Sequence, residues 1–308
     1  MKNFINISDH SSSDLRAIID EAKTRKLSRK EFNKSAPDDD KPFEGKSMAM
    51  IFEKPSTRTR MSFDIAAKQL GGSSIILNPD GIHYGKGDET LKDTAKVLTE
   101  YVDIVMLRTS SHKNLEEFGK HLDIPIINGL SDKSHPCQIM SDILTYEESN
   151  GSITGKTVSW LGDGDNNMSN SLIEAAGKFK FNLKIGCPKK YAPGKKILGW
   201  AKKNKVNLLI TQKPDEAVKN SDCVMTDKWV SMNDKVNKKT KKKVLKPFQV
   251  NKKLMKKANS NAIFMHCLPV GRGEEVTDEV IDGKQSVVWR QALNRVHAQK
   301  SIIKWCLD

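Results

Sequence analysis

The stretch SMAMIFEKPSTRTR, residues 47–60, passes from a run of apolar residues into a cluster of hydroxyl and guanidinium side chains. Residues 47–53 have the length and composition of a buried strand, and the sequence after residue 56 favours a helix. A strand that leads through a polar turn into a helix is typical of α/β proteins. Because ligands in such proteins bind beyond the carboxyl ends of strands, this turn is the first candidate binding site.

Apolar runs of strand length alternate with helical stretches along the rest of the chain, which again favours an α/β fold. Several runs are continuously apolar, as expected for strands that helices cover on both faces. We therefore predict two doubly wound parallel-sheet domains with an active-site cleft between them. The predicted strands are 47–53, 73–78, 103–109 and 124–129 in the first half, and 156–162, 181–187, 207–211, 222–226 and 262–267 in the second.

The segment 136–151 has the pattern of a single helix that ends at Gly151, and it marks the boundary between the two predicted domains. We expect the first domain to cover residues 1–149 and the second to cover residues 150–308. The final segment, about 290–308, also has helical spacing. We expect this last helix to pack back on the first domain.

The composition is that of a soluble folded protein, with 308 residues of which 37% are hydrophobic and 29% charged. No apolar run approaches the ~20 residues that a helix needs to span a bilayer. The first residues lack the long apolar segment of a secretory signal, so we expect a cytoplasmic protein that does not contact membranes. The five cysteines form no CxxC pair, which argues against a disulfide framework or a zinc site.

The net charge of +14 is compatible with nucleic-acid binding, but its distribution does not favour that function. Much of the excess is lysine between Lys235 and Lys257, where Phe248 is the only aromatic residue. A nucleic-acid surface more typically combines arginine with interleaved aromatic residues. We interpret this segment as a solvated loop and helix face and expect no nucleic-acid partner, although positive charge attracts anionic substrates in general.

The turn at residues 56–60 has the chemistry of an anion site. A helix that begins near Ser56 offers backbone N–H groups without helical partners and the positive end of its dipole. Thr57 and Thr59 add hydroxyl donors, and Arg58 adds a planar guanidinium suited to phosphate. An ordinary helix cap with solvated arginines is the alternative interpretation. Because the pattern GxxxxGK[ST] is absent, ATP is not the expected phosphate donor.

Arg108 closes the third predicted strand, and HPCQ, residues 135–138, follows the fourth. At that strand end Arg108 is placed to provide a second cation for the same anion. His135 and Gln138 lie one turn apart at a helix start, where both can face one pocket. A neutral imidazole N–H or an amide there can polarise a carbonyl oxygen. Helix capping with a packed histidine is the alternative interpretation.

Three polar stretches follow strands of the second half. GDGDNN begins like a dinucleotide fingerprint but has Asn167 where the third glycine belongs, so NAD binding is not expected. Asn167 instead offers an amide to a polar ligand, or belongs to an ordinary Asx turn. Asp227 and Ser231 lie four residues apart in TDKWVSMND, an arrangement that suits an ammonium group. HCLP contributes Cys267, either as a ligand contact or as a buried thiol.

Taken in order, STRTR, HPCQ, DxxxSM and HCLP resemble the aspartate/ornithine carbamoyltransferase family, and within it the ornithine branch. The resemblance extends from the first strand to Arg295. It implies transfer of a carbamoyl group from carbamoyl phosphate to the δ-amine of L-ornithine, giving citrulline and phosphate, without a metal or other cofactor. It also implies a role in arginine metabolism, with biosynthesis as the expected direction. A further implication is a homotrimer, or a multiple of trimers, in which a neighbouring subunit lends part of the carbamoyl phosphate site.

The resemblance transfers the site residues of the family to the matching positions of this sequence. The carbamoyl phosphate ligands that it implies are Ser56, Thr57, Arg58, Thr59, His83, Arg108, His135, Pro136, Cys137 and Gln138. The ornithine ligands that it implies are Asn167, Asp227, Ser231 and Met232, and the residues that complete the site at the domain interface are Cys267, Leu268 and Arg295. The residues expected to take part in catalysis are Arg58, His135, Asp227 and Cys267.

Three positions depart from the pattern of the family. His83 stands in place of the usual glutamine after the second strand, and its contact with phosphate would depend on pH. Cys137 replaces the threonine of HPTQ, which removes a hydroxyl donor but leaves the backbone in place. Asn233 replaces the glycine of SMG, and asparagine tolerates a positive φ better than most residues.

Three other functions fit parts of the pattern. A carbamoyltransferase for putrescine or an acylated ornithine would keep the phosphate motifs and change the acceptor site. An aspartate-specific enzyme would need more cations for a dicarboxylate, where this chain has Asp227 and HCLP. A basic scaffold or nucleic-acid-binding protein that merely keeps the fold would have lost some of these motifs, and the central ones are all present.

Overall fold

The computed structural model describes residues 2–78, 89–230 and 237–308. The chain divides into two compact units, one formed by Met1–Leu144 with Leu293–Asp308 and the other by Thr145–Ala292. The two points where the chain passes between them lie within the helices α5 (Pro136–Asn150) and α12 (Val288–Leu307). In the part of the chain that is described, no helix is long and apolar enough to cross a membrane.

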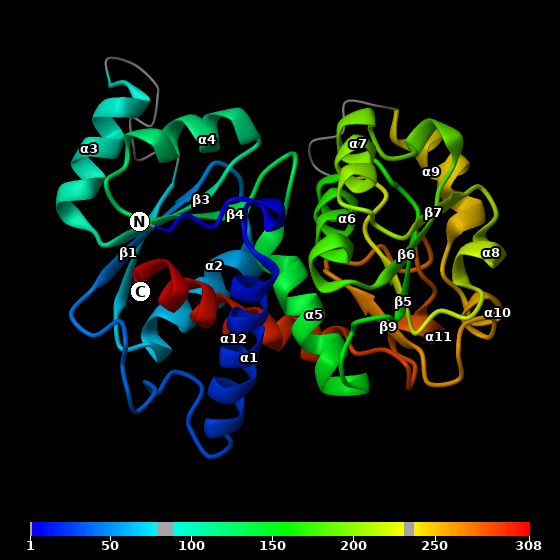
Figure 1. Cartoon of the computed structure of the whole chain (residues 1–308), viewed down its shortest axis with the longest axis horizontal. Coiled ribbons are helices and arrows are strands. Elements are labelled where there is room, and N and C mark those ends of the chain that lie inside the picture. Colours follow the sequence, from blue (N-terminus) through cyan, green and yellow to red (C-terminus); the bar gives the residue numbers. More distant parts are fainter. Residues whose placement is uncertain (1, 79–88, 231–236) are drawn as a thin grey trace. The chain divides into compact units, whose positions relative to one another are not determined.

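The first unit is built on a four-stranded parallel sheet in the order β2-β1-β3-β4 (Figure 1). Its strands are β1 (Ser47–Phe52), β2 (Ser73–Leu77), β3 (Ile104–Arg108) and β4 (Ile126–Leu130). Its helices are η1 (Ile7–Asp9), α1 (Ser12–Ser28), α2 (Thr57–Gln69), α3 (Leu91–Tyr101), α4 (His112–His121), the start of α5 and most of α12. Ala49 and Val105 on neighbouring strands pack with Leu115 and Phe118 of α4 in the core of this unit.

The second unit is built on a five-stranded parallel sheet in the order β7-β6-β5-β8-β9 (Figure 1). Its strands are β5 (Thr157–Leu161), β6 (Asn182–Gly186), β7 (Leu208–Thr211), β8 (Cys223–Thr226) and β9 (Ile263–His266). Its helices are α6 (Asn167–Phe179), η3 (Lys189–Tyr191), α7 (Lys195–Lys203), α8 (Pro214–Val218), α9 (Lys238–Leu245), η4 (Lys246–Phe248), α10 (Lys252–Met255) and α11 (Asp278–Ile281). Val224 and Phe264 pack with Phe248 and Val288 in its core.

The predicted fold class of two parallel-sheet α/β domains is confirmed, and each of the nine predicted runs overlaps a strand of the described structure. The interior strands β1, β3, β5 and β8, and the edge strand β9, are buried along almost their whole length, as their continuous apolar sequences indicate. The edge strands β2 and β7 are equally apolar but largely accessible. The other two edge strands, β4 and β9, are buried, and each forms an isolated bridge, between Ile127 and Phe4 and between Phe264 and Ser286. The apolar run alone did not distinguish an edge strand from an interior one.

The order of the strands places a topological switch point in each sheet. In the first sheet the order reverses between β1 and β3, and in the second it reverses between β5 and β8. Loops that leave two strands at a switch point diverge and leave a crevice for a ligand beyond the carboxyl ends of the strands. In the first sheet, the motif STRTR follows β1 and Arg108 is the last residue of β3. In the second sheet, GDGDNN follows β5 and Asp227 follows β8.

A buried ionic cluster fixes the carboxyl-terminal part of α12 within the first unit. The carboxylate of Asp38 accepts hydrogen bonds from Arg25 (2.9 Å), Arg29 (2.6 Å) and Lys300 (2.8 Å). Burial lowers the pKa of Lys300 to about 8, although Asp38 opposes the shift. The three cationic donors compensate the cost of burying the carboxylate of Asp38. Removal of this carboxylate would leave buried positive charge without a partner.

One turn before Lys300, the buried imidazole of His297 makes this unit sensitive to acid. Burial, followed by the positive charges of Lys300 and Lys26, lowers the pKa of His297 to about 3. The imidazole is therefore neutral in the folded protein at pH values where the unfolded chain, with a histidine pKa near ~6.5, takes up a proton. Since the unfolded state binds more protons in this window, the free energy of unfolding falls as the pH falls from about 6.5 towards 3.

We expect the variant His297→Gln to lose this part of the acid sensitivity. Between pH 7 and pH 5 the unfolding free energy of the unmodified protein would fall by about 2 kcal/mol more than that of the variant. The reason is that His297 takes up a proton on unfolding in this range, whereas the glutamine that replaces it does not titrate. Urea unfolding at both pH values measures the difference. The variant His121→Gln, at the partly accessible end of α4, controls for the loss of a histidine. Equal pH dependence in His297→Gln and the unmodified protein would contradict the prediction.

Candidate active site

The amino-terminal end of α2 has the geometry of an anion-binding site. Strand β1 ends at Phe52, and α2 begins at Thr57 with Ser56 as an extended N-cap. The side chain of Ser56 makes no capping hydrogen bond, and the first turn of α2 contains no acidic residue. Backbone N–H groups and the positive end of the helix dipole are therefore directed towards whatever lies beyond Ser56.

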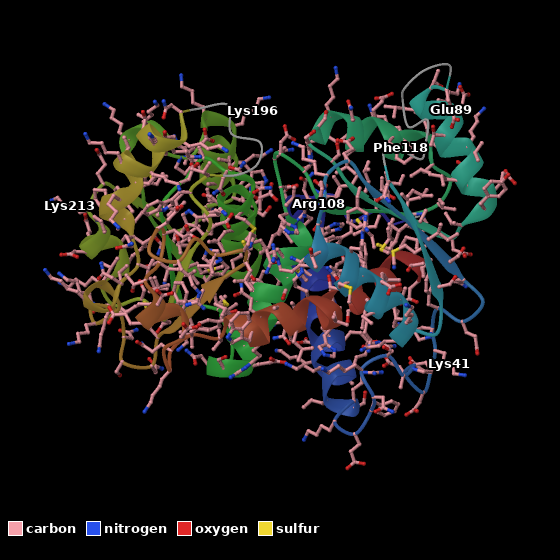
Figure 2. All side chains as sticks on the ribbon, turned by 180° about the vertical axis from the view of Figure 1, so that it is seen from behind. Lys41, Glu89, Arg108, Phe118, Lys196 and Lys213 are labelled. Atoms are coloured by element: carbon pink, nitrogen blue, oxygen red, sulfur yellow. The ribbon has the colours of Figure 1, made fainter. Side chains whose placement is uncertain are left out.

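Thr59, which is buried in the first turn of α2, joins two arginines from distant parts of the chain. Its Oγ1 accepts hydrogen bonds from Arg108 at the end of β3 (3.2 Å) and from Arg295 of α12 (2.9 Å). Arg108 is labelled in Figure 2. A hydroxyl oxygen has two lone pairs, so these two bonds use its capacity as an acceptor. Its own hydrogen is then directed to a third group, and Thr59 can serve a ligand only as a donor.

His135 is buried at the start of α5 among positive charges. Burial, followed by the charges of Arg295, Arg108 and Arg58, lowers the pKa of this imidazole well below its usual value. His135 is consequently neutral near pH 7 and acts as a polar N–H donor without adding charge. The residues Arg58, Thr59, Arg108, His135 and Arg295, which the sequence selected as site residues, thus come together in the first unit.

Gln138 lies one turn further along α5, and a residue that sequence reasoning missed holds its amide. Its Oε1 accepts from Arg295, and its Nε2 donates to Asp142 Oδ1 at 2.8 Å. Because Asp142 is an acceptor and Arg295 a donor, the two partners fix which way the amide of Gln138 points. The spacing of four residues within HPCQIMSD was a signal that could have indicated Asp142.

The remaining members of HPCQ shape the backbone of the site. Pro136 is the first residue of α5, where proline is well tolerated. The thiol of Cys137 is buried and donates to the carbonyl oxygen of Asn128 (3.4 Å), and burial raises its pKa to about 12. Its side chain therefore belongs to the interior of the unit.

In the second unit, the loop between β5 and α6 carries the amide group selected from the sequence. Asn166 caps α6 by accepting from the N–H of Ser169 (2.8 Å), so this asparagine is engaged locally. Asn167 is the first residue of α6 and is half-buried. Asp163, earlier in the loop, pairs with the ammonium group of Lys241 of α9 at 2.6 Å, and both side chains are buried. This pair, which the sequence did not indicate, anchors α9 to the loop.

Asp227 and Cys267 meet at the carboxyl ends of the neighbouring strands β8 and β9. The thiol of Cys267 donates to Asp227 Oδ1 at 3.1 Å. Of the five cysteines, Cys267 is the one that is only partly buried. A carboxylate beside an accessible thiol is suited to hold an ammonium group, as the sequence suggested for Asp227. The sequence alone did not show that the two side chains touch.

The turn that follows Cys267 has an unusual backbone conformation, and buried side chains hold it in place. Leu268 has a φ of +58°, in the left-handed region that residues other than glycine rarely adopt. Its N–H donates to Nδ1 of His266 (2.9 Å), and Nε2 of the same ring lies 3.2 Å from the carboxylate of Glu275. Neither His266 nor Glu275 was selected from the sequence as a site residue, although His266 belongs to the HCLP motif.

Asp227, His266 and Cys267 bring potential metal-ligand atoms within 4.8 Å of one another in the described residues. The hydrogen bonds of the imidazole argue against a prearranged metal site. Nδ1 of His266 accepts from Leu268, and Nε2 faces Glu275 as a donor, so neither nitrogen presents a lone pair to an ion. The group is better suited to an amine than to a metal.

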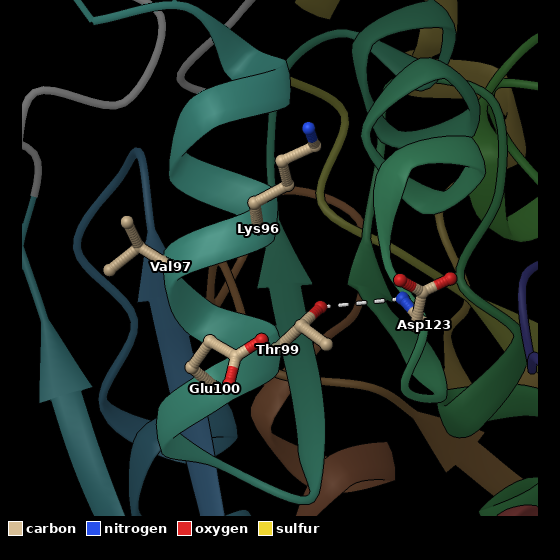
Figure 3. Close-up of a pocket in the computed structure, with 5 residues that line it drawn as sticks. All are labelled: Lys96, Val97, Thr99, Glu100 and Asp123. Atoms are coloured by element: carbon tan, nitrogen blue, oxygen red, sulfur yellow. Dashed lines mark hydrogen bonds between the residues drawn. The ribbon is translucent and has the colours of Figure 1, made fainter.

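Three residues selected from the sequence, His83, Ser231 and Met232, lie outside the described residues. A separate surface hollow between α3 and the end of α4 is lined by Lys96, Val97, Thr99, Glu100 and Asp123 (Figure 3). Its one hydrogen bond between these residues runs from the N–H of Asp123 to Thr99 Oγ1 (3.3 Å). It contains none of the residues that the sequence selected, and its charges are of both signs.

Comparison with protein families agrees with this division of chemistry between the two units. Residues 2–148 match the model of the carbamoyl-P binding domain of aspartate/ornithine carbamoyltransferase, and residues 154–306 match the model of its Asp/Orn binding domain. The chain therefore belongs to the aspartate/ornithine carbamoyltransferase family. Similar proteins within that family carry the name ornithine carbamoyltransferase.

The relatives are similar over their full length. Those from Brucella ovis and Rhizobium meliloti are each 49% identical, and the alignments cover 100% and 99% of this chain and 96% and 98% of the relatives. Solved structures give the same result. Ornithine carbamoyltransferase from Pyrococcus furiosus has a TM-score of 0.91 at 42% identity, covering 98% of this chain and 96% of that one. The anabolic enzyme from Campylobacter jejuni has a TM-score of 0.89 at 35% identity, with 99% of both chains covered.

Proposed function

We propose that this chain is an ornithine carbamoyltransferase, a transferase that moves the carbamoyl group of carbamoyl phosphate to the δ-amine of L-ornithine. The products are L-citrulline and phosphate. The observation that carries the proposal is the convergence of Arg58, Arg108 and Arg295 on a neutral His135 at the start of α5. We assign residues 1–149, with the helix at about 290–308, to carbamoyl phosphate and residues 150–308 to ornithine.

The phosphate of the donor is expected to lie at the amino terminus of α2. Ser56, Thr57 and Thr59 provide hydroxyl and backbone donors there, and Arg58 and Arg108 provide charge. His83 belongs to the same set by resemblance. These groups stabilise the negative charge that accumulates on phosphate as it leaves. Stabilisation of developing charge by preorganised donors is usually the largest single contribution to the rate.

The carbonyl oxygen of the donor is expected to face His135, Gln138 and Arg58. As the amine attacks, a C–N bond forms and charge develops on this oxygen, and the C–O bond to phosphate then breaks with its electron pair leaving on phosphate. A neutral imidazole stabilises that charge as a hydrogen-bond donor without repelling the arginines around it. Because the carbamoyl group is already activated by phosphate, the reaction needs no metal or organic cofactor.

The acceptor is expected to bind beside Asp227 and Cys267, with contacts from Asn167, Leu268, Ser231 and Met232. Aliphatic amines are largely protonated near pH 7, so the site must hold an ammonium ion and release it as a neutral amine before attack. Asp227 provides the charge that attracts the ammonium group, and the thiol of Cys267 is within hydrogen-bond distance of the same carboxylate. The proton lost by the amine passes to this pair or to solvent. A dicarboxylate such as aspartate would be repelled by Asp227, which favours ornithine as the acceptor.

A direct assay tests the proposal. Purified protein is incubated with carbamoyl phosphate and, separately, with L-ornithine, L-aspartate, putrescine and N-acetylornithine, and each carbamoylated product is quantified. We expect citrulline from ornithine and little product from the other acceptors. Robust product from another amine, with no citrulline, would assign the chain to a different acceptor. No product from any acceptor would favour a protein that keeps the fold without the activity.

We also propose that the chain forms a homotrimer, or a multiple of trimers, through its first unit. The edge strand β2 exposes Ile75 and Ile76, and the neighbouring helices expose Met61, Val97 and Tyr101, of which Tyr101 is 74% exposed. An accessible apolar edge strand promotes association between chains unless it is covered. In sequence, His83 lies six residues after the end of β2, so an interface at this edge would be near the point where the chain leaves β2 towards His83.

Substitution at this edge is expected to dissociate the assembly. In Ile75→Asp a charge replaces an apolar side chain that association would bury, so we expect a shift from trimer to monomer in sedimentation velocity, together with loss of activity. The matched control is Leu209→Asp on β7, the partly exposed edge strand of the other unit. A monomeric unmodified protein, or a trimer that survives Ile75→Asp, would contradict the assignment of this surface.

A further inference from the structure

The backbone beside the thiol of Cys267 adopts a conformation that needs external support. Leu268, the next residue, has a φ of +58°, and a leucine pays for this conformation with contact between its Cβ and the backbone. Such residues persist where surrounding groups over-determine them, and they are concentrated at functional sites. The backbone conformation of Leu268 must therefore be stabilised by groups that surround the turn.

The support is a buried polar pair with one defined arrangement of hydrogens. Nδ1 of His266 accepts the N–H of Leu268 at 2.9 Å, so this nitrogen carries no hydrogen. The hydrogen of the ring is then on Nε2, which lies 3.2 Å from Glu275 Oε1 and donates to it. The side chains of His266 and Glu275 are both 0% exposed, so water does not replace either bond.

Glu275 holds both ends of the turn through one oxygen atom. Besides the imidazole hydrogen, Oε1 accepts the backbone N–H of Gly271. The turn from His266 to Gly271 is thus closed through a single carboxylate, and Cys267 and Leu268 lie inside the closed loop. Space is tight as well, because a Cβ added at Gly271 would lie 2.7 Å from Glu275 Oε2.

We propose that Glu275 is a positioning residue for the acceptor half of the reaction. Through the Nε2–H form of His266 it fixes the N–H of Leu268, and thereby the direction in which the thiol of Cys267 meets Asp227. Glu275 itself need not touch either substrate. The kinetic part of this inference rests on the proposed ornithine site, whereas the effect on the thiol does not.

Two substitutions separate the acceptor geometry of Glu275 from its charge. Glu275→Asp keeps the charge but withdraws the oxygen by one carbon, so the bonds to His266 and Gly271 are broken or lengthened. Glu275→Gln removes the charge but leaves a carbonyl oxygen that can accept both bonds. The matched control is Glu274→Asp, which shortens the adjacent carboxylate, the partner of Lys242 on the surface of the same segment.

The first readout is the rate at which a thiol reagent such as 5,5′-dithiobis(2-nitrobenzoate) labels Cys267. The other four cysteines are buried, and Cys267→Ser provides the blank. We expect the labelling rate in Glu275→Asp to change by about tenfold or more, because the hydrogen bond from the thiol of Cys267 to Asp227 is misdirected. We expect the labelling rates in Glu275→Gln and Glu274→Asp to stay within about twofold of the rate in the unmodified protein. This experiment needs no turnover, so it gives an answer even if the chain proves inactive with ornithine.

The second readout is the Michaelis constant for each substrate. In Glu275→Asp we expect KM for ornithine to rise by about 10–100-fold with KM for carbamoyl phosphate changed less than about twofold, and Glu275→Gln to restore both. Thermal unfolding confirms that each variant is folded at the assay temperature. A merely structural role would change both constants together, or neither, and that result would overturn the proposal. So would a Glu275→Gln variant that is folded but behaves like Glu275→Asp.

Discussion

In the variant Arg58→Ala we expect kcat/KM for carbamoyl phosphate to fall by about 10²–10³-fold, because a preorganised cationic donor to the developing charge is lost. Arg58 is half-buried at the second position of α2, and its charge contributes to the lowered pKa of His135. It makes no hydrogen bond with another described residue, so its role in stability is small. The melting temperature should therefore change little, and steady-state kinetics with a thermal melt measure both quantities.

Arg60→Ala is the matched control for this prediction. Arg60 lies in the same turn of α2, but its guanidinium donates to Asn78 (2.6 Å) and lies over the ring of Phe52 at 5.3 Å. These contacts are local and structural, so we expect kcat/KM to stay within a few-fold of its original value. Near-normal turnover in Arg58→Ala would refute the assignment of α2 as the phosphate site. Equal losses in both variants would indicate that the helix had been disturbed rather than the chemistry.

The second large effect is expected in Asp227→Asn, which keeps the shape of the side chain and removes its charge. A hydrogen bond to a charged group contributes about 1.5–3 kcal/mol, so KM for ornithine should rise by roughly 10–10²-fold while KM for carbamoyl phosphate remains similar. Initial rates measured against each substrate in turn give both constants. The thiol of Cys267 can still donate to the amide oxygen, which leaves the local geometry supported.

Asp215→Asn serves as the control for the loss of a carboxylate in the same unit. Asp215 is exposed and pairs with Lys257 at 2.5 Å on the surface, where ion pairs have little energetic effect. We expect unchanged kinetics in this variant. An Asp227→Asn enzyme that binds ornithine normally would mean that another group holds the ammonium ion, and the acceptor assignment would have to move away from the Asp227–Cys267 pair.

The sequence was most informative where physical constraints act over a few residues. A strand buried on both faces must be apolar throughout, and a loop that follows it must be polar to meet a ligand, so the strands and the motifs at their ends could be recognised from the sequence. Arg108 is an example, since it ends β3 at the switch point of the first sheet. The same reasoning could not separate β2 and β7 from interior strands, because the position of a strand in a sheet depends on pairing across the fold.

Contacts between distant residues were beyond this reasoning. Arg295 and Thr59 are 236 positions apart, and only a family resemblance, not spacing, indicated that they belong to one site. Glu275 was missed altogether, because a residue that acts through another carries no signature of its own in one sequence, whereas Asp142 had only its spacing of four residues from Gln138 as a signal. Burial of such carboxylates becomes apparent only when the groups that donate to them are placed in space.

The hydrogen bonds of Thr59 have a consequence for the ionisation state of the ligand. Because Arg108 and Arg295 occupy both lone pairs of the hydroxyl, Thr59 can give a hydrogen bond to a ligand oxygen but cannot receive one. A phosphate oxygen that has taken up a proton loses this partner, and the neighbouring guanidinium groups, which are also donors only, offer it no replacement. Thr59 and these guanidinium groups thus favour the fully ionised ligand, so protonation of the ligand itself weakens its binding.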